Sequence, residues 1–168
     1  FASRTTPWIA VVEGLAVGGG CEICLACDMI VASETARFGL PEVKRGLMAG
    51  AGGVHRIAAA LPRNIANELL ATGANFDAAL AHRFGLVNRL TPSGEAMNAA
   101  RELAETIAAN APLAVQHTLA AARESQGQAD GAARSFVSGR MAMLRRSEDF
   151  REGPRAFMEK REPVWTGR

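Results

Sequence analysis

Residues 8–28 read WIAVVEGLAVGGGCEICLACD, and the rest of the chain is organised around them. The apolar run from Trp8 to Val12 is short and β-branched, which is typical of a buried strand. Gly14 interrupts it, and residues 18–20, all glycine, lead into a predicted buried helix at 21–27. A glycine turn before a helix leaves backbone N–H groups free beside the positive end of the helix dipole. We therefore expect this turn to hold an anion or a developing oxyanion.

Glu22 lies one turn inside that helix, among apolar neighbours. A carboxylate beside an oxyanion site is a candidate acid or base. A helix-face charge paired with an arginine is the alternative that the residues leave open. Other glycine motifs do not fit, because Ile23 stands where a dinucleotide fingerprint needs glycine and Cys21 where a P-loop needs lysine. No G-x-S-x-G motif occurs, which argues against a serine hydrolase.

A second carboxylate follows Pro41, which fixes the backbone before Glu42. A helix followed by a strand that runs back returns the chain to the same edge of a sheet. This takes about as many residues as separate Glu22 from Glu42 in the sequence. The spacing therefore permits both carboxylates to face one cleft, although a solvent-exposed loop carboxylate is equally compatible with it.

A second glycine-rich entry, MAGAGG at 48–53, precedes a predicted helix at 54–61. Its N–H groups could hold a water or a carboxylate, or its glycines could allow close helix packing. His55 and His82 are interpreted as packing or surface residues, because no partner acid can be identified for a catalytic histidine.

Composition excludes some classes of protein. The 168 residues carry a formal net charge of +2, which gives no electrostatic reason to expect nucleic-acid or membrane binding. No apolar run reaches membrane-spanning length, and no signal peptide is visible. The three cysteines form C-x-x-C-x-x-C on a predicted helix without a fourth ligand, so no metal site is expected. Reduced thiols fit a cytoplasmic protein.

The remaining elements follow from periodicity and from turn residues. Strands are predicted at 28–32, 36–38 and 86–90, and helices at 64–71 and at 78–84, the latter capped by Asp77. From Pro92 onward the predicted helices are 94–110, 112–126, 130–146 and 149–161. The sequence therefore predicts an α/β part at 1–91 with β-α-β character and a helical part at 92–168.

The strings GLAVGGGCEICLACD, ARFGLPEVKRGL and GAGG, in this order, resemble the enoyl-CoA hydratase/isomerase (crotonase) family from about Pro7 to the last residue. The resemblance implies an α/β crotonase-like ββα spiral followed by a helical trimerisation module. Residues 1–91 would be the C-terminal part of the spiral core and 92–168 the helical module. Family architecture and ordinary domain size imply about a hundred further residues before Phe1, so we expect a fragment.

The resemblance also implies a function, namely syn hydration of a trans-2-enoyl-CoA to a 3-hydroxyacyl-CoA. Glu22 matches the glutamate that activates water and Glu42 the glutamate that protonates C2. Gly19 matches the oxyanion-hole glycine and Gly50 a glycine that positions water. Phe157 and Lys160 match residues near the nucleotide end of CoA, in contact with a neighbouring subunit.

The same resemblance implies no cofactor beyond the CoA of the substrate, no metal, and a homotrimer or homohexamer in the cytoplasm. Three alternatives remain open. An isomerase usually keeps only the glutamate that matches Glu42, so Glu22 argues against it. The chain end, EGPRAFMEKREPVWTGR, resembles bacterial members that include the carnitinyl-CoA hydratase branch. A non-enzymatic acyl-CoA or RNA binder is the third, and the presence of only two lysines argues against RNA.

Overall fold

The computed structural model describes residues 4–168, and they form two compact units. The first is Trp8–Leu103, and the second is Ala104–Arg168 together with the segment that ends at Pro7. Helix α5 (Ala96–Ala108) begins in the first and ends in the second. The expected domain boundary between residues 91 and 92 concerns the whole protein and stays a prediction.

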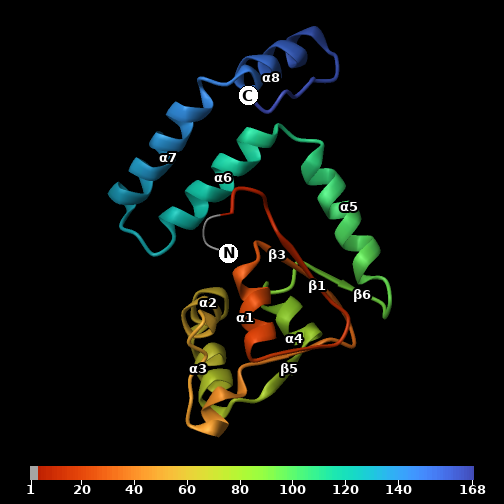
Figure 1. Ribbon diagram of the computed structural model, residues 1–168, viewed down its shortest axis with the longest axis vertical. Helices are drawn as coiled ribbons and strands as arrows, with labels where there is room; N and C mark the ends of the chain where they lie inside the picture. The colour runs from red at the N-terminus through yellow and green to blue at the C-terminus, as the bar shows by residue number, and fades with distance from the viewer. Residues whose placement is uncertain (1–3) are drawn as a thin grey trace. The chain divides into compact units, whose positions relative to one another are not determined.

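A parallel three-stranded sheet lies at the centre of the first unit, in the order β1 (Ile9–Val12), β3 (Met29–Ser33), β6 (Arg89–Thr91) (Figure 1). Successive side chains of a strand point to opposite faces. Ile30 and Ala32 accordingly enter the main core, while Val31 packs with Ala96 of α5. Residues of β3 therefore pack on both faces of the sheet, which explains why Met29 to Ala32 are apolar without interruption.

The second sheet consists of strands of three residues each, β2 (Leu15–Val17), β4 (Arg37–Gly39) and β5 (Asn75–Asp77). β2 pairs parallel with β4, and β5 pairs antiparallel with it. Phe38 and Phe76 stack across that antiparallel pair with ring centroids 5.7 Å apart. The sequence did not predict β2 or β5, because three residues are too few to show a period of two.

Four helices cover the main core of this unit: α1 (Gly19–Ala26), α2 (Gly53–Ala60), α3 (Arg63–Thr72) and α4 (Ala78–Arg83). The predicted cap of α4 is confirmed, since Asp77 Oδ1 accepts the N–H of Leu80 at 2.7 Å. The predicted strand at 86–90 is wrong over its first half. The N–H groups of Leu86 and Val87 donate to Ala81 O at 2.8 and 3.2 Å, so these residues close the end of α4 instead.

The second unit is helical, with α6 (Pro112–Ser125), α7 (Asp130–Leu144) and α8 (Glu148–Glu159). α6 and α7 pack against each other along their length. Arg140 of α7 forms a two-pronged ion pair with Glu124 of α6, and this raises the pKa of the guanidinium and lowers that of the carboxyl. Two-pronged pairs of this kind fix geometry as well as adding energy.

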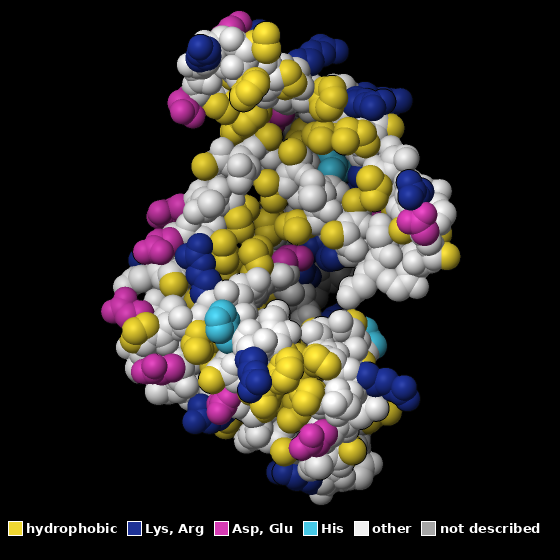
Figure 2. Space-filling view, turned by 180° about the vertical axis from the view of Figure 1, so that it is seen from behind, with side chains coloured by type: hydrophobic (Ala, Val, Ile, Leu, Met, Phe, Trp, Pro, Cys, Tyr) yellow, Lys and Arg dark blue, Asp and Glu magenta, His cyan; other side chains and the backbone are white. Residues whose placement is uncertain are grey.

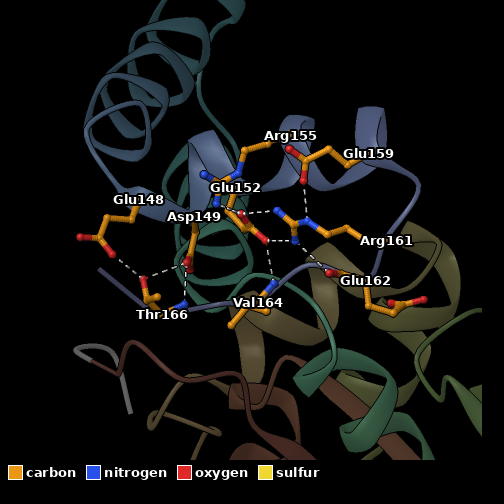
Figure 3. Close-up of polar contacts among 9 residues, drawn as sticks. All are labelled: Glu148, Asp149, Glu152, Arg155, Glu159, Arg161, Glu162, Val164 and Thr166. Atoms are coloured by element: carbon orange, nitrogen blue, oxygen red, sulfur yellow. Dashed lines mark hydrogen bonds and ion pairs between the residues drawn. The ribbon is translucent and has the colours of Figure 1, made fainter.

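The last residues of the chain fold back along α8 and are held by two of its buried acids (Figure 3). Asp149 Oδ1 accepts the N–H of Thr166 at 2.7 Å. Glu152 accepts hydrogen bonds from Arg155, from Arg161 and from the backbone N–H of Val164. Lys160 ends α8 in the left-handed conformation, with φ of 54°, and so reverses the chain toward this contact.

Hydrophobic side chains gather in patches on the surface (Figure 2). The large hydrophobic side chains with the greatest exposure come from several different parts of the chain. They are Leu15, Leu47, Met48, Phe157, Met158 and Val164. In the described part of the chain, every helix is too short or too polar to cross a bilayer.

Candidate active site

The site is built around the turn between β2 and α1. Gly18 has φ of 58° and ψ of −127°, a conformation that side chains with a Cβ rarely adopt. Its N–H donates to Gly39 O at 2.9 Å, which ties the turn to the end of β4. Gly19 is the first residue of α1 and is exposed. The first N–H groups of a helix have no intrahelical acceptor, so the turn presents donors to any group placed beside it.

Glu22 lies in the first turn of α1, is buried, and is held by the neighbouring helix. Its Oε1 accepts the N–H of Gly53, the first residue of α2, at 3.0 Å. The N-terminal end of a helix carries positive partial charge, which favours a carboxylate at this place. A Cβ on Gly53 would come within 2.7 Å of Ala49 Cβ and 3.1 Å of Glu22 Cγ, so only glycine fits there.

Glu42 is the second residue of a short 3-10 helix, Pro41–Arg45, that follows β4. Its Oε2 is buried and has no hydrogen-bond partner among residues 4–168. Its Oε1 lies 3.3 Å from the position that a Cβ on Gly18 would occupy, so the carboxyl group faces the glycine turn. A buried acid oxygen without a partner is costly, and such groups occur where a substrate completes the site.

The structure therefore brings together three of the predicted residues, Gly19, Glu22 and Glu42. Burial is the main cause of the raised pKa of the Cys21 thiol, and Glu42 and Glu22 add to it. Gly50 lies in the exposed loop before α2, close in sequence to Gly53. Phe157 and Lys160 lie in the second unit, at the end of α8, and both are exposed.

The histidines and cysteines that the sequence analysis considered lie on or next to the helices of the first unit. His55 lies exposed on the first turn of α2. His82 Nδ1 lies 3.0 Å from Val87 O and helps to close the end of α4. Cys21 and Cys24 are buried on α1, and burial raises the pKa of these thiols to about 12 and about 11. Among residues 4–168, no three His, Cys, Asp or Glu side chains are placed to hold a metal ion.

Sequence reasoning missed the individual roles of Gly18 and Gly53. It identified the glycine-rich segment before α2 and considered a carboxylate ligand and close packing as alternatives. The structure shows both at one residue, since Gly53 N–H binds Glu22 and its Cα allows α2 to approach Ala49. The signal available in the sequence was the glycine pair that ends the segment, but nothing in it indicated which carboxylate would be bound.

The fold agrees with comparisons to known proteins. The family model for enoyl-CoA hydratase/isomerase matches residues 2–168, and the chain belongs to this family. Among solved structures, an enoyl-CoA hydratase from Mycobacterium tuberculosis H37Rv is 46% identical with a TM-score of 0.95, over 100% of this chain and 68% of that one. One from Geobacillus kaustophilus HTA426 is 40% identical with a TM-score of 0.94, over 99% and 65%. The predicted crotonase-like α/β fold is thereby confirmed.

Two curated relatives are named as carnitinyl-CoA dehydratases. Carnitinyl-CoA dehydratases from Salmonella paratyphi A and from Citrobacter koseri are each 44% identical over 170 residues. The alignments cover 96% of this chain and 64% of each relative. The chain thus spans less than two thirds of the length of these relatives.

Proposed function

We propose that this chain carries the catalytic glutamates of an enoyl-CoA hydratase, which adds water to a trans-2-enoyl thioester to give a 3-hydroxyacyl-CoA. The observation that carries the proposal is that Glu42 faces the glycine turn while Glu22 lies in the first turn of the helix that follows this turn. Glu42 Oε2 has no partner among the described residues, and Glu22 is held by the N–H of Gly53. Membership of the hydratase/isomerase family supports the same chemistry.

The reaction consists of two proton transfers and the shift of one electron pair toward the thioester oxygen. Glu22 accepts a proton from water as the water oxygen bonds to C3 of the enoyl group. The electron pair of the C2–C3 double bond moves toward the thioester oxygen, which the N–H of Gly19 binds. Glu42 then donates its proton to C2, and the thioester carbonyl reforms. Loss of one oxyanion donor typically costs about 10²–10³ in rate.

The contacts are compatible with these roles. Glu22 Oε1 accepts the N–H of Gly53, which fixes the position of the carboxyl group. Glu42 Oε2 has no hydrogen-bond partner among the described residues, so it is available to a substrate. General base and general acid catalysis require the pair to start the reaction with opposite protonation.

The remaining expectations extend this proposal to the whole protein. The substrate is an acyl-CoA thioester, and no cofactor beyond its CoA is required. Gly50 positions the attacking water, while Phe157 and Lys160 contact the nucleotide end of CoA. The protein assembles as a homotrimer or homohexamer in the cytoplasm.

Glutamine variants of the full-length protein test the proposal. Glu22→Gln and Glu42→Gln keep the side-chain shape and remove the titratable group, so each should lower kcat for crotonyl-CoA hydration by about 10²–10⁴. Loss of absorbance of the conjugated thioester measures hydration. Exchange of the C2 proton with solvent should disappear in Glu42→Gln, because Glu42 delivers that proton.

Three outcomes would contradict it. A Glu22→Gln variant that hydrates crotonyl-CoA at the parent rate would show that Glu22 does not activate the water, and a parent that shifts the double bond of an enoyl-CoA without hydrating crotonyl-CoA would favour the isomerase. A parent protein that binds acyl-CoA without turnover would favour the acyl-CoA-binding alternative.

A second candidate is hydration of crotonobetainyl-CoA to carnitinyl-CoA, which the 44% identity to carnitinyl-CoA dehydratases favours. The chemistry at C2 and C3 is unchanged, and the acyl group instead carries a trimethylammonium cation. Comparing kcat/KM for crotonobetainyl-CoA and crotonyl-CoA separates the two. A ratio above about 10 assigns the carnitinyl branch, since such a ratio corresponds to about 1.4 kcal/mol of differential transition-state binding.

A further inference from the structure

The loop before α2 carries the backbone N–H that holds Glu22, and the side chain of Arg56 folds back over this loop. The hydrogen bond from Gly53 N–H to Glu22 Oε1 is 3.0 Å long and buried. Gly52, the residue before it, is also buried and has φ of 115°, which a side chain with a Cβ rarely adopts. Glycine is the residue with the greatest backbone freedom, so the direction in which Gly53 donates needs support from other contacts.

Arg56 supplies that support on both sides of Gly52. Its Nη1 donates to Ala51 O at 3.1 Å, which holds the peptide plane that precedes Gly52. Its backbone N–H donates to Gly52 O at 3.2 Å, which holds the peptide plane that follows and that carries the Gly53 N–H. Peptide units are planar, and only the two torsions of Gly52 connect these planes. Holding both planes therefore fixes the direction of the Gly53 N–H.

The guanidinium group of Arg56 lies where a side chain of residue 52 would otherwise be. A Cβ on Gly52 would overlap Arg56 Nη1 and come within 2.7 Å of Arg56 Cζ. The arginine is half-buried in this position. A positive charge at the N-terminal end of a helix opposes the helix dipole, so the stability of α2 does not explain the placement. The contact with the loop does explain it.

We propose that Arg56 is a positioning residue, which holds the loop at 48–53 so that the Gly53 N–H meets Glu22. The inference rests on the proposed hydratase function, in which Glu22 accepts a proton from the attacking water. The same loop contains Gly50, to which the proposed function assigns the positioning of that water. A displacement of about 1 Å in such a site can cost about 10²-fold in rate.

Three single variants of the full-length protein test the proposal. Arg56→Met keeps a long unbranched side chain and removes the N–H donors. Arg56→Lys keeps the charge and loses the planar guanidinium. Arg63→Met is the matched control, because Arg63 is an exposed arginine at the first position of α3, the helix that follows α2. The measurements are kcat and KM for crotonyl-CoA and the thermal midpoint of each variant.

The expected effect is a loss of kcat. Arg56→Met should lower kcat by about 10-fold to 100-fold, because the carboxyl group of Glu22 loses its fixed orientation. KM should change less than about 2-fold, because the groups that bind the substrate are not altered. The kcat of Arg56→Lys should fall between those of Arg56→Met and the parent. Arg63→Met should keep the kcat and KM of the parent.

A double-mutant cycle with Glu22→Gln distinguishes positioning from a general structural role. Arg56→Met should lower the residual kcat of Glu22→Gln by less than about 2-fold, because the carboxylate that Arg56 positions is already absent. A general loss of packing would instead lower kcat by the same factor in both backgrounds. If Arg56→Met does not fold, Arg56→Lys replaces it in the cycle, with a loss of at least about 3-fold in the parent and less than about 2-fold in Glu22→Gln.

The outcomes separate the two proposals. Parent kcat in Arg56→Met, or an equal loss in Arg63→Met, overturns the positioning role. Losses that multiply in the double variant also overturn it, because Arg56 then does not act through Glu22. In each of these cases the parent is an active hydratase and the proposed function stands. A parent without hydratase activity overturns the proposed function and removes the basis of this inference with it.

Discussion

The two compact units differ in how their buried carboxylate oxygens are hydrogen-bonded. In the second unit, Glu152 accepts two arginines and a backbone N–H, and Asp149 accepts the backbone N–H groups of Thr166 and Gly167 (Figure 3). In the first unit, Glu22 accepts one backbone N–H, and Glu42 Oε2 accepts nothing from the described residues.

This difference agrees with a structural role for the acids of the second unit and with the catalytic role that we propose for Glu22 and Glu42. A buried polar group that is left unpaired costs about 1–3 kcal/mol, and more when it is charged. In the second unit, side chains and backbone N–H groups of the same unit donate to Glu152 and Asp149. These hydrogen bonds hold the end of the chain in place. In the first unit, Glu42 Oε2 has no such donor among the described residues, and Glu22 has one.

The largest expected effect comes from exchanging one residue of each kind for glutamine. Glu42→Gln should lower kcat by about 10²–10⁴ while thermal stability stays equal or rises, because an unpaired acid is removed. Glu152→Gln should keep the kcat of the folded protein and lower stability, because Arg155 and Arg161 lose their shared acceptor. Calorimetry and steady-state kinetics on both variants check this. Loss of stability in both variants would contradict the contrast.

Glycines of the two units should respond oppositely to alanine. Gly53→Ala places a methyl group 2.7 Å from Ala49 Cβ and against Glu22, so it should cost about 1–3 kcal/mol and also lower kcat. Gly139→Ala, within α7, has nothing within 4 Å and should stabilise the protein by about 0.5–1 kcal/mol. Urea unfolding measures both, and a stable, fully active Gly53→Ala would show that Glu22 does not need its helix contact.

Acid should destabilise the second unit through Glu152. Hydrogen bonds from Arg161, Val164 and Arg155 hold the pKa of this carboxyl well below its usual 4.5. Its stabilising contribution is therefore complete above pH 4.5 and is lost as the pH falls below that value, because the unfolded chain takes up the proton first. Unfolding free energies measured between pH 3 and pH 6 should decline more for the parent than for Glu152→Gln. Parallel declines would exclude Glu152 as the cause.

Alkali should weaken the first unit through its thiols. Burial raises the pKa of Cys21 to about 12 and that of Cys24 to about 11, from an ordinary 9.0. Their contribution is present below pH 9 and is lost as the pH rises toward those values, because the unfolded chain ionises first. Iodoacetamide should label both slowly in the folded protein and quickly in urea, with the labelled cysteines identified by mass spectrometry. Rapid labelling of Cys21 in the folded state would contradict its burial.

Most structural elements that depend on a local sequence pattern were predicted correctly from the sequence. The apolar run of β1, the glycine entry to α1 and the cap at Asp77 each depend on neighbouring residues, and the structure confirms all three. The resemblance to the family predicted the fold. The strands β2 and β5 were missed because their formation depends on pairing with β4 rather than on their own pattern.

The site was predictable as a set of residues, and its contacts were not. Spacing permitted Glu22 and Glu42 to share a cleft, and nothing in it showed that Glu42 would face Gly18 or that Gly53 would bind Glu22. Such contacts join segments from different elements and depend on how closely α1, α2 and β4 pack. The catalytic roles of these residues stay predictions.

The pairing of β3 with β6 has a consequence for how the chain acquires its structure. The N–H of Ile30 donates to the side chain of Asn88 across 58 residues, and Val31 pairs with Arg89. Contacts between residues so far apart in the chain form slowly, because a long loop must close before they give any stabilisation. During synthesis, Gly19, Glu22 and Glu42 therefore leave the ribosome before β6 can complete the sheet of β1, β3 and β6. The contacts between α6 and α7 are local in the chain, so this helical hairpin can form as soon as both helices have been synthesised.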